Sequence, residues 1–255
     1  MKNYFNFEKS NILILGASSG FGKIYSETFY NLGANVISLA RNTKKLKKLK
    51  SDCEKKKSKG SIEIFNCDIN KEKQVNNFIK KIKQKYNKLN IVVYCCGCNV
   101  RQLFTEIKKK DFENIMQTNY FSAFNIYRKL YPMLKNSSYG RIINLTSIFS
   151  SRTMKKRTSY SASKAALLML TKSLALEWCS KNFTINSISP GPFLTEINLP
   201  VLNNKKEYKK MCEKIPLGRF GNVDEIITPM LFLASPHSSY VNGAEIVVDG
   251  GWNIL

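Results

Sequence analysis

The sequence predicts a single α/β domain whose parallel sheet is covered by helices on both faces. Short apolar runs alternate with longer segments of helical periodicity, as repeated β–α–β units require. The strand candidates are continuously apolar rather than alternating, which is typical of strands buried on both faces. The length of 255 residues suits one domain, and no repeat, linker or compositional break marks a second.

Seven strands are expected, at residues 11–15, 35–39, 62–66, 91–95, 141–145, 183–188 and 244–248. The first of these runs read NILIL and NVISL, in which β-branched and large aliphatic side chains dominate. Helices are expected between the strands, at residues 20–32, 44–56, 71–86, 111–134, 159–180 and 223–233. The segment from about 194 to 215 lies between the last two strands as an insertion, and such long connections are often lids over a site.

The chain is strongly basic, with a net charge of +23. A charge of this size raises the alternative of a nucleic-acid-binding protein. Of the 41 basic residues, however, only 7 are Arg, the residue that bidentate recognition of phosphates and bases favours. The lysines are also spread from Lys2 to Lys214. We therefore expect a solvated basic surface and no nucleic-acid partner.

Several other classes of protein are disfavoured. His237 is the only histidine, which excludes His-rich metal sites and leaves Ser-His-Asp chemistry dependent on one residue. The 7 cysteines lack paired C-x-x-C spacing, so we expect reduced thiols and no metal site. Neither the N-terminal MKNYFNFEKS nor the uncharged stretch 226–244 has the pattern of a signal peptide or membrane span. A cytoplasmic protein without a membrane partner is expected.

The turn after the first predicted strand is rich in glycine. It reads Gly16-Ala-Ser-Ser-Gly20-Phe-Gly22 and leads directly into a predicted helix. Glycine lets the backbone turn tightly and approach a phosphate, which the free N–H groups at the start of the helix can bind. This placement predicts a doubly wound, Rossmann-type dinucleotide-binding domain.

The end of the second predicted strand indicates which dinucleotide is bound. An acidic side chain there would hold the ribose 2′-hydroxyl of NAD, but this chain has Ala40-Arg41-Asn42. Because a guanidinium pairs well with a 2′-phosphate, Arg41 favours NADP over NAD. NAD stays open as the alternative, since Arg41 is also one basic residue among many.

Tyr160 and Lys164 form a Tyr-x-x-x-Lys motif on a predicted helix, where residues four apart share a face. A nearby ammonium lowers the pKa of a phenol, so that Tyr160 could exchange a proton with a substrate alcohol or ketone. The spacing alone is weak evidence, because 12 Tyr and 34 Lys produce it by chance and Tyr131-Pro-Met-Leu-Lys135 repeats it. Context favours Tyr160, which follows the fifth strand and has Ser147 at that strand's end.

Taken in order, these motifs resemble the short-chain dehydrogenase/reductase family, nearly from end to end. Further matches are Asp68 after the third strand, the Pro190–Thr195 element after the sixth, and the closing Asp249-Gly250-Gly251. The resemblance implies that the catalytic residues are Asn119, Ser147, Tyr160 and Lys164. Tyr160 would be the general acid/base and Lys164 would bind nicotinamide ribose hydroxyls. Ser147 would bond the substrate oxygen, and Asn119 would hold a relay water.

The resemblance also implies a set of cofactor-binding residues around the ends of the strands. They are Gly16, Ser18, Ser19, Gly20, Phe21, Gly22, Arg41, Asp68, Ile69, Cys95, Gly97, Tyr160, Lys164, Pro190, Gly191, Phe193 and Thr195. One departure stands out, because the family's Asn-Asn-Ala-Gly is replaced here by Tyr94-Cys95-Cys96-Gly97. We expect lower local stability or a slightly altered cofactor affinity from this change.

The substrate is predicted less sharply. Arg101, Ser147 and Phe149 are the expected substrate residues, and Arg101 could pair with a carboxylate. The chain is similar to gluconate and deoxygluconate dehydrogenases at Arg101, in the run PGPFLTEIN at 190–198, in the element PLGRFG at 216–221 and at the closing Gly-Gly-Trp. The alternative is a 3-oxoacyl-[acyl-carrier-protein] reductase, whose acidic carrier a basic surface would suit. A non-catalytic nucleotide-sensing protein is a further alternative. By resemblance, a homotetramer is expected.

Overall fold

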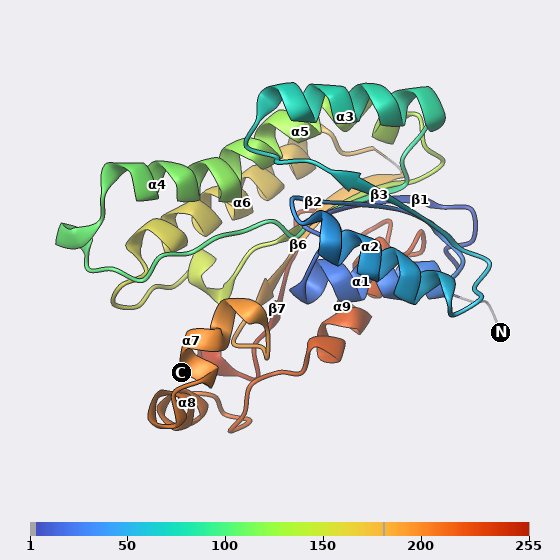
Figure 1. The fold of residues 1–255 in the computed structure, drawn as a ribbon. Coiled ribbons are helices and arrows are strands. Elements are labelled where there is room, and N and C mark those ends of the chain that lie inside the picture. The colour runs from blue at the N-terminus through green and yellow to red at the C-terminus, as the bar shows by residue number, and fades with distance from the viewer. Residues whose placement is uncertain (1–3, 181, 255) are drawn as a thin grey trace.

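The computed structural model describes residues 4–180 and 182–254. Its seven strands form one parallel sheet in the order β3-β2-β1-β4-β5-β6-β7 (Figure 1). The strands are β1 (Asn11–Leu15), β2 (Asn35–Ala40), β3 (Ser61–Asn66), β4 (Ile91–Tyr94), β5 (Gly140–Leu145), β6 (Phe183–Pro190) and β7 (Glu245–Val248). The predicted fold class is therefore confirmed, and every predicted strand is present.

The centre of the sheet is where the strand order reverses. β1 pairs with β2 on one side and β4 on the other, so that Leu15 lies opposite both Leu39 and Tyr94. In open parallel sheets the loops leaving such a switch point diverge and leave a crevice at the carboxyl ends of the strands. The glycine turn after β1 lies at that crevice.

Helices cover both faces of the sheet, as predicted (Figure 1). One face carries α3 (Glu72–Lys85), α5 (Ser122–Lys135) and α6 (Thr158–Glu177), and the other carries α1 (Gly20–Asn31), α2 (Thr43–Glu54) and α9 (Ile227–Ala234). Alternate residues of each strand point to opposite faces. Leu13 and Val92 thus join the first core, whereas Ile12 and Ile91 join the second. The continuously apolar strand pattern follows from burial on both sides.

The helix predicted at 111–134 is two helices. α4 (Lys109–Met116) and α5 are joined by one π-helical turn at Gln117–Phe121. A π turn places an extra residue in the helix and is often found at functional sites. An extra residue shifts the helical phase by about 100°. The sequence pattern did not show this shift, because Ile115 is the one buried residue of α4 and no apolar stripe precedes the turn.

The predicted insertion after β6 folds as a short helical segment. It contains α7 (Leu199–Leu202) and α8 (Lys205–Cys212), and has its own small core of Val201, Ile215 and Phe220. Figure 1 shows this segment standing away from the main body beside β7.

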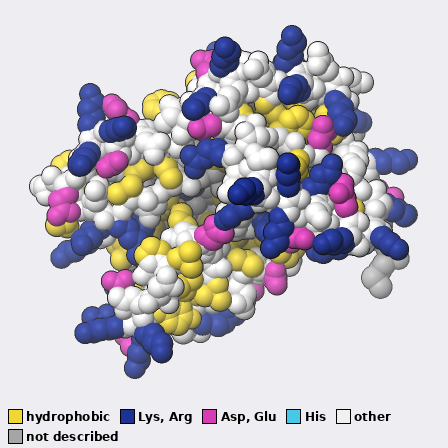
Figure 2. All heavy atoms as spheres, in the orientation of Figure 1, with side chains coloured by type: hydrophobic (Ala, Val, Ile, Leu, Met, Phe, Trp, Pro, Cys, Tyr) yellow, Lys and Arg dark blue, Asp and Glu magenta, His cyan; other side chains and the backbone are white. Residues whose placement is uncertain are grey.

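The positive charge is dispersed over the surface. Figure 2 shows Lys and Arg side chains over most of the visible face rather than in one patch. Within the described ranges, no helix has both the length and the apolar character needed to cross a membrane.

Candidate active site

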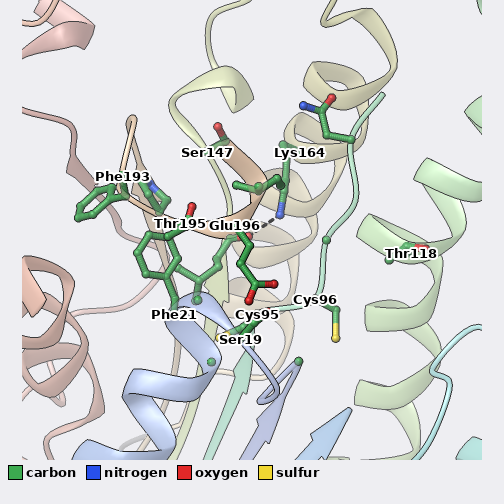
Figure 3. A pocket seen from close by; sticks show the side chains of 18 of the residues that line it. Ser19, Phe21, Cys95, Cys96, Thr118, Ser147, Lys164, Phe193, Thr195 and Glu196 are labelled. Atoms are coloured by element: carbon green, nitrogen blue, oxygen red, sulfur yellow. Dashed lines mark hydrogen bonds between the residues drawn. The ribbon is translucent and has the colours of Figure 1, made fainter. Parts of the chain in front are cut away.

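A single cleft collects the predicted cofactor residues at the carboxyl end of the sheet (Figure 3). Its walls come from the β1–α1 turn, the ends of β2, β3, β4 and β5, the start of α6, and the segment after β6. Every residue predicted to bind the cofactor lines it, from Gly16 to Thr195. Ser147 and Phe149, two of the predicted substrate residues, also line it.

The glycine turn is shaped to bring backbone close to a ligand. Gly16 has φ +90°, a conformation that strongly favours glycine. A Cβ on Gly22 would lie 2.2 Å from the Gly16 carbonyl oxygen, so the turn packs against α1 without room for a side chain. The N-cap residue Ser19 makes no side-chain capping bond, which leaves the first N–H groups of α1 available for a phosphate. The turn therefore fits a dinucleotide.

The part of the cleft beside the ends of β2 and β3 is lined by Arg41 and Asp68. Nearby, Lys45 of α2 reaches across to Glu196, which follows β6. Its Nζ atom lies 2.7 and 2.8 Å from the two carboxylate oxygens of Glu196. This ion pair joins the predicted lid segment to the side of the cleft that carries Arg41.

Tyr160 lies near the start of α6, beside Ser147. Burial raises the pKa of Tyr160 above its usual value, and hydrogen bonding from Ser147 and the charge of Arg157 act in the opposite direction. Burial therefore outweighs the favourable interactions, and Arg157 is the cation whose charge lowers the pKa of the phenol here. The expectation that Lys164 acidifies Tyr160 stays a prediction.

Lys164 is buried under the cleft, only 4% exposed. Its Nζ donates a 2.7 Å hydrogen bond to the Leu145 carbonyl and lies 5.9 Å from the centre of the Tyr160 ring. Burial lowers the pKa of Lys164 to about 8. In Figure 3 its side chain points into the cleft between Ser147 and the Cys95–Cys96 segment.

Asn119 is fully buried in the π turn and does not line the cleft. Its amide Nδ2 donates to the Cys98 carbonyl and to Ser163 Oγ, and its Oδ1 accepts from the Cys98 N–H at 2.9 Å. The side chain thus fixes the chain after β4 against α6. Its predicted relay role stays a prediction.

The second Tyr-x-x-x-Lys motif lies elsewhere. Tyr131 packs against Trp178, with ring centres 4.4 Å apart, and it does not line the cleft. Tyr131 therefore belongs to an aromatic cluster on the face of the sheet that α5 and α6 cover. This agrees with the preference for Tyr160 over Tyr131 as the site tyrosine.

Hydrogen bonds hold the Tyr94-Cys95-Cys96-Gly97 segment, which departs from the family's sequence, against its neighbours. Tyr94 is buried and donates a 2.5 Å hydrogen bond to the Thr118 carbonyl, and the Cys95 N–H bonds the Leu15 carbonyl. Burial raises the pKa of Cys96 to about 12, so that thiol stays protonated at neutral pH.

Sequence reasoning missed several residues of the cleft, namely Asn99, Arg157, Met211 and Trp252. Arg157 could have been found, since it lies three residues before Tyr160 at the start of the same helix. Met211 comes from a distant segment and carries no local signal, whereas Trp252 ends the Gly-Gly-Trp motif of the sequence but was not assigned to the site. Arg101, which was predicted to bind substrate, does not line the cleft and is half-buried.

The parallel sheet, the glycine turn and the Ser147–Tyr160–Lys164 cluster together define an oxidoreductase of the dinucleotide-binding type. The chain belongs to the short-chain dehydrogenase/reductase family. A model of this family described as Enoyl-(Acyl carrier protein) reductase matches residues 16–253.

Relatives match along almost the whole chain. A 3-oxoacyl-[acyl-carrier-protein] reductase of Rickettsia typhi is 32% identical over 96% of this chain and 98% of its own length. A chloroplastic tropinone reductase homolog of Arabidopsis thaliana is 31% identical, covering 99% of this chain and 78% of its own.

Solved structures agree closely with the fold. A gluconate 5-dehydrogenase from Burkholderia cenocepacia, in complex with NADP and tartrate, superposes with a TM-score of 0.92 at 27% identity, covering 99% of this chain and 98% of its own. The Pseudomonas aeruginosa RhlG/NADP complex has a TM-score of 0.92 at 25% identity, covering 99% and 100%.

Proposed function

We propose that this protein is an NADP(H)-dependent oxidoreductase that interconverts a ketone and a secondary alcohol, with a sugar-acid-type substrate. The observation that carries the proposal is the convergence of Ser147, Tyr160 and Lys164 on one cleft with the glycine turn. NADP is favoured over NAD because Arg41 lines the part of the cleft beside the ends of β2 and β3, where the adenosine would bind. The NADP complexes among the structural neighbours support the same preference.

The residues of the cleft have separate tasks in this mechanism. The bound nicotinamide would supply or accept the hydride. Ser147 donates a hydrogen bond to the substrate oxygen, and Tyr160 exchanges a proton with that oxygen. The Lys164 ammonium holds the cofactor's ribose, and Asn119 supports the relay by holding the chain at Cys98.

The raised pKa of Tyr160 gives the two directions different pH dependences. Carbonyl reduction needs a protonated phenol, which is the form favoured below the pKa. Alcohol oxidation needs the phenolate, which is favoured above it. We expect reduction to proceed at neutral pH and oxidation to accelerate as the pH rises.

The second candidate is a 3-oxoacyl-[acyl-carrier-protein] reductase. The similarity to the Rickettsia typhi enzyme supports it, and a surface of net charge +23 suits an acidic carrier protein. The gluconate 5-dehydrogenase neighbour, which was crystallised with the hydroxy-diacid tartrate, supports the sugar-acid candidate.

Assembly as a homotetramer through α4, α5, α6 and the last strand, β7, belongs to the same proposal. Large apolar side chains of these helices and the π turn are exposed, including Phe121, Phe124, Met169 and Leu176. Such side chains on adjacent helices support burial against further copies of the chain. Light scattering would show a mass near four chains if this is correct and one chain if it is not.

The test is NADPH oxidation, followed by absorbance, with a β-ketoacyl thioester and a keto-sugar acid as competing substrates. Faster turnover of the acid supports the first candidate, and faster turnover of the thioester supports the second. Binding of NADPH without turnover of any carbonyl compound would contradict both. The alternative of a nucleic-acid-binding protein predicts retention of DNA that falls steeply with salt.

A further inference from the structure

Arg157 places a buried guanidinium in the cleft. Its side chain is only 7% exposed, and it lines the cleft beside Tyr160. Across the described parts of the chain, no carboxylate pairs with it and no side chain or carbonyl accepts a hydrogen bond from it. Buried charged groups are normally paired, because loss of hydration must be offset by an opposite charge or by hydrogen bonds.

Its neighbours hold Arg157 in place without neutralising it. The guanidinium carbon lies 5.5 Å from the centre of the Phe149 ring, a cation–π arrangement. Phe149 also contacts Tyr160 and Trp252, with ring centres 6.4 and 6.3 Å apart. These aromatic side chains form the wall next to the reacting phenol.

A second cation, Arg101, adds to the unpaired positive charge near Arg157. Burial and the nearby charge of Arg101 both lower the pKa of Arg157, to about 10, so it stays a cation at neutral pH. Two like charges close together favour an anion between or beside them.

An acceptor without a donor lies in the same cleft. The Oδ1 atom of Asn99 is buried and has no hydrogen-bond partner in the described residues. A substrate hydroxyl would satisfy it, just as an oxyanion would satisfy Arg157.

We propose that Arg157 is a specificity-determining residue that binds an oxyanion group of the substrate, a carboxylate or a phosphate, next to the carbonyl handled by Tyr160. This inference rests on the proposed function and narrows its substrate to small hydroxylated anions. It favours them over 3-oxoacyl thioesters, which carry no anionic group beside the ketone and would leave the guanidinium without a counter-charge.

The test compares charged and neutral partners in matched pairs. These are 5-ketogluconate with its methyl ester, and dihydroxyacetone phosphate with dihydroxyacetone. The parent is expected to prefer the anion in at least one pair, and the preferred pair distinguishes carboxylate from phosphate. In Arg157→Met, kcat/KM for the anion should fall by about 100-fold while the neutral partner changes far less, because only the anion loses a charged hydrogen bond. Arg157→Lys should recover part of the loss.

Lys155→Met is the matched control, since it removes an exposed positive charge from the same loop. It should leave the preference for the anion as in the parent. Melting temperature and NADPH affinity, measured for all variants, report on folding and on the cofactor site. Equal losses for anion and neutral partner in Arg157→Met would indicate that Arg157 acts through packing or through the pKa of Tyr160, and would overturn the proposal.

Calorimetry separates this proposal from the proposed function. The NADP⁺-loaded parent should bind 5-ketogluconate or dihydroxyacetone phosphate, and Arg157→Met should lose that binding. If the parent binds an anion in this way but turns over no carbonyl compound, the proposed function fails and the anion site stands. If it reduces neutral ketones and thioesters as well as anions, the proposed function stands and the anion site is refuted.

Discussion

The buried charge of Lys164 is predicted to lower the free energy of unfolding of the protein at neutral pH. Its pKa falls from 10.5 to about 8 on burial. Each pKa unit corresponds to about 1.4 kcal/mol, so the charged Lys164 costs the folded state about 3 kcal/mol at neutral pH. The lysine binds its proton more weakly in the folded than in the unfolded chain. Its cost is therefore full below pH 8 and disappears as the pH rises towards the ordinary lysine pKa.

Lys164→Met removes this cost together with the hydrogen bond to the Leu145 carbonyl, a charged bond worth about 1.5–3 kcal/mol. Relief of the charge cost stabilises the variant, and loss of the hydrogen bond destabilises it by a similar amount. The free energy of unfolding of the variant near pH 7 should therefore lie within about 1–2 kcal/mol of the parent's. Between pH 7 and pH 9.5 the parent should gain about 2 kcal/mol relative to the variant.

Urea unfolding at a series of pH values measures this difference directly, since groups common to both proteins cancel. Lys172→Met, an exposed lysine on the same helix, is the matched control for loss of a positive charge. A difference between parent and Lys164→Met that is independent of pH would refute the reasoning. It would mean that Lys164 keeps an ordinary pKa in the fold.

Three further predictions concern the cofactor cleft. Gly22→Ala should lose more than about 2 kcal/mol of stability and most NADPH binding, because its Cβ would lie 2.2 Å from the Gly16 carbonyl oxygen. A variant with the parent's melting temperature and NADPH affinity would contradict the close packing of this turn. Arg41→Met should weaken NADPH binding by about tenfold or more and change NADH binding little. Cofactor fluorescence measures both affinities, with Lys44→Met as the control. Equal losses for the two cofactors would contradict a contact between Arg41 and the 2′-phosphate. Cys95→Asn, which restores the family's side chain, should raise the melting temperature or NADPH affinity; no change in either would dismiss the expected effect of this departure.

The fold could be predicted almost entirely from the sequence, because it depends on repeated local patterns. Apolar runs such as 11–15 and 35–39 are strands since both faces of the sheet are buried, and the turn at Gly16–Gly22 needs glycine for steric reasons visible in the sequence alone. The π turn at Gln117–Phe121 was missed, because α4 before it buries one residue, Ile115, and so presents no apolar stripe whose shift could be seen.

The site was less predictable where burial and distant segments decide. Sequence spacing placed Lys164 near Tyr160, but only the packed structure shows that burial raises the phenol's pKa and that Arg157 opposes this effect. Trp252 lies close to Phe149 because the chain returns to the cleft after β7, and no local pattern in the sequence records that contact.

The central claim is that Tyr160 is the proton donor to a carbonyl held in a dinucleotide cleft. Tyr160→Phe tests it most directly, because the variant removes one hydroxyl and keeps the ring. It should still bind NADPH and oxidise it with a keto substrate about 100- to 10,000-fold more slowly at saturating cofactor. Oxidation at the parent's rate, with binding intact, would contradict the account.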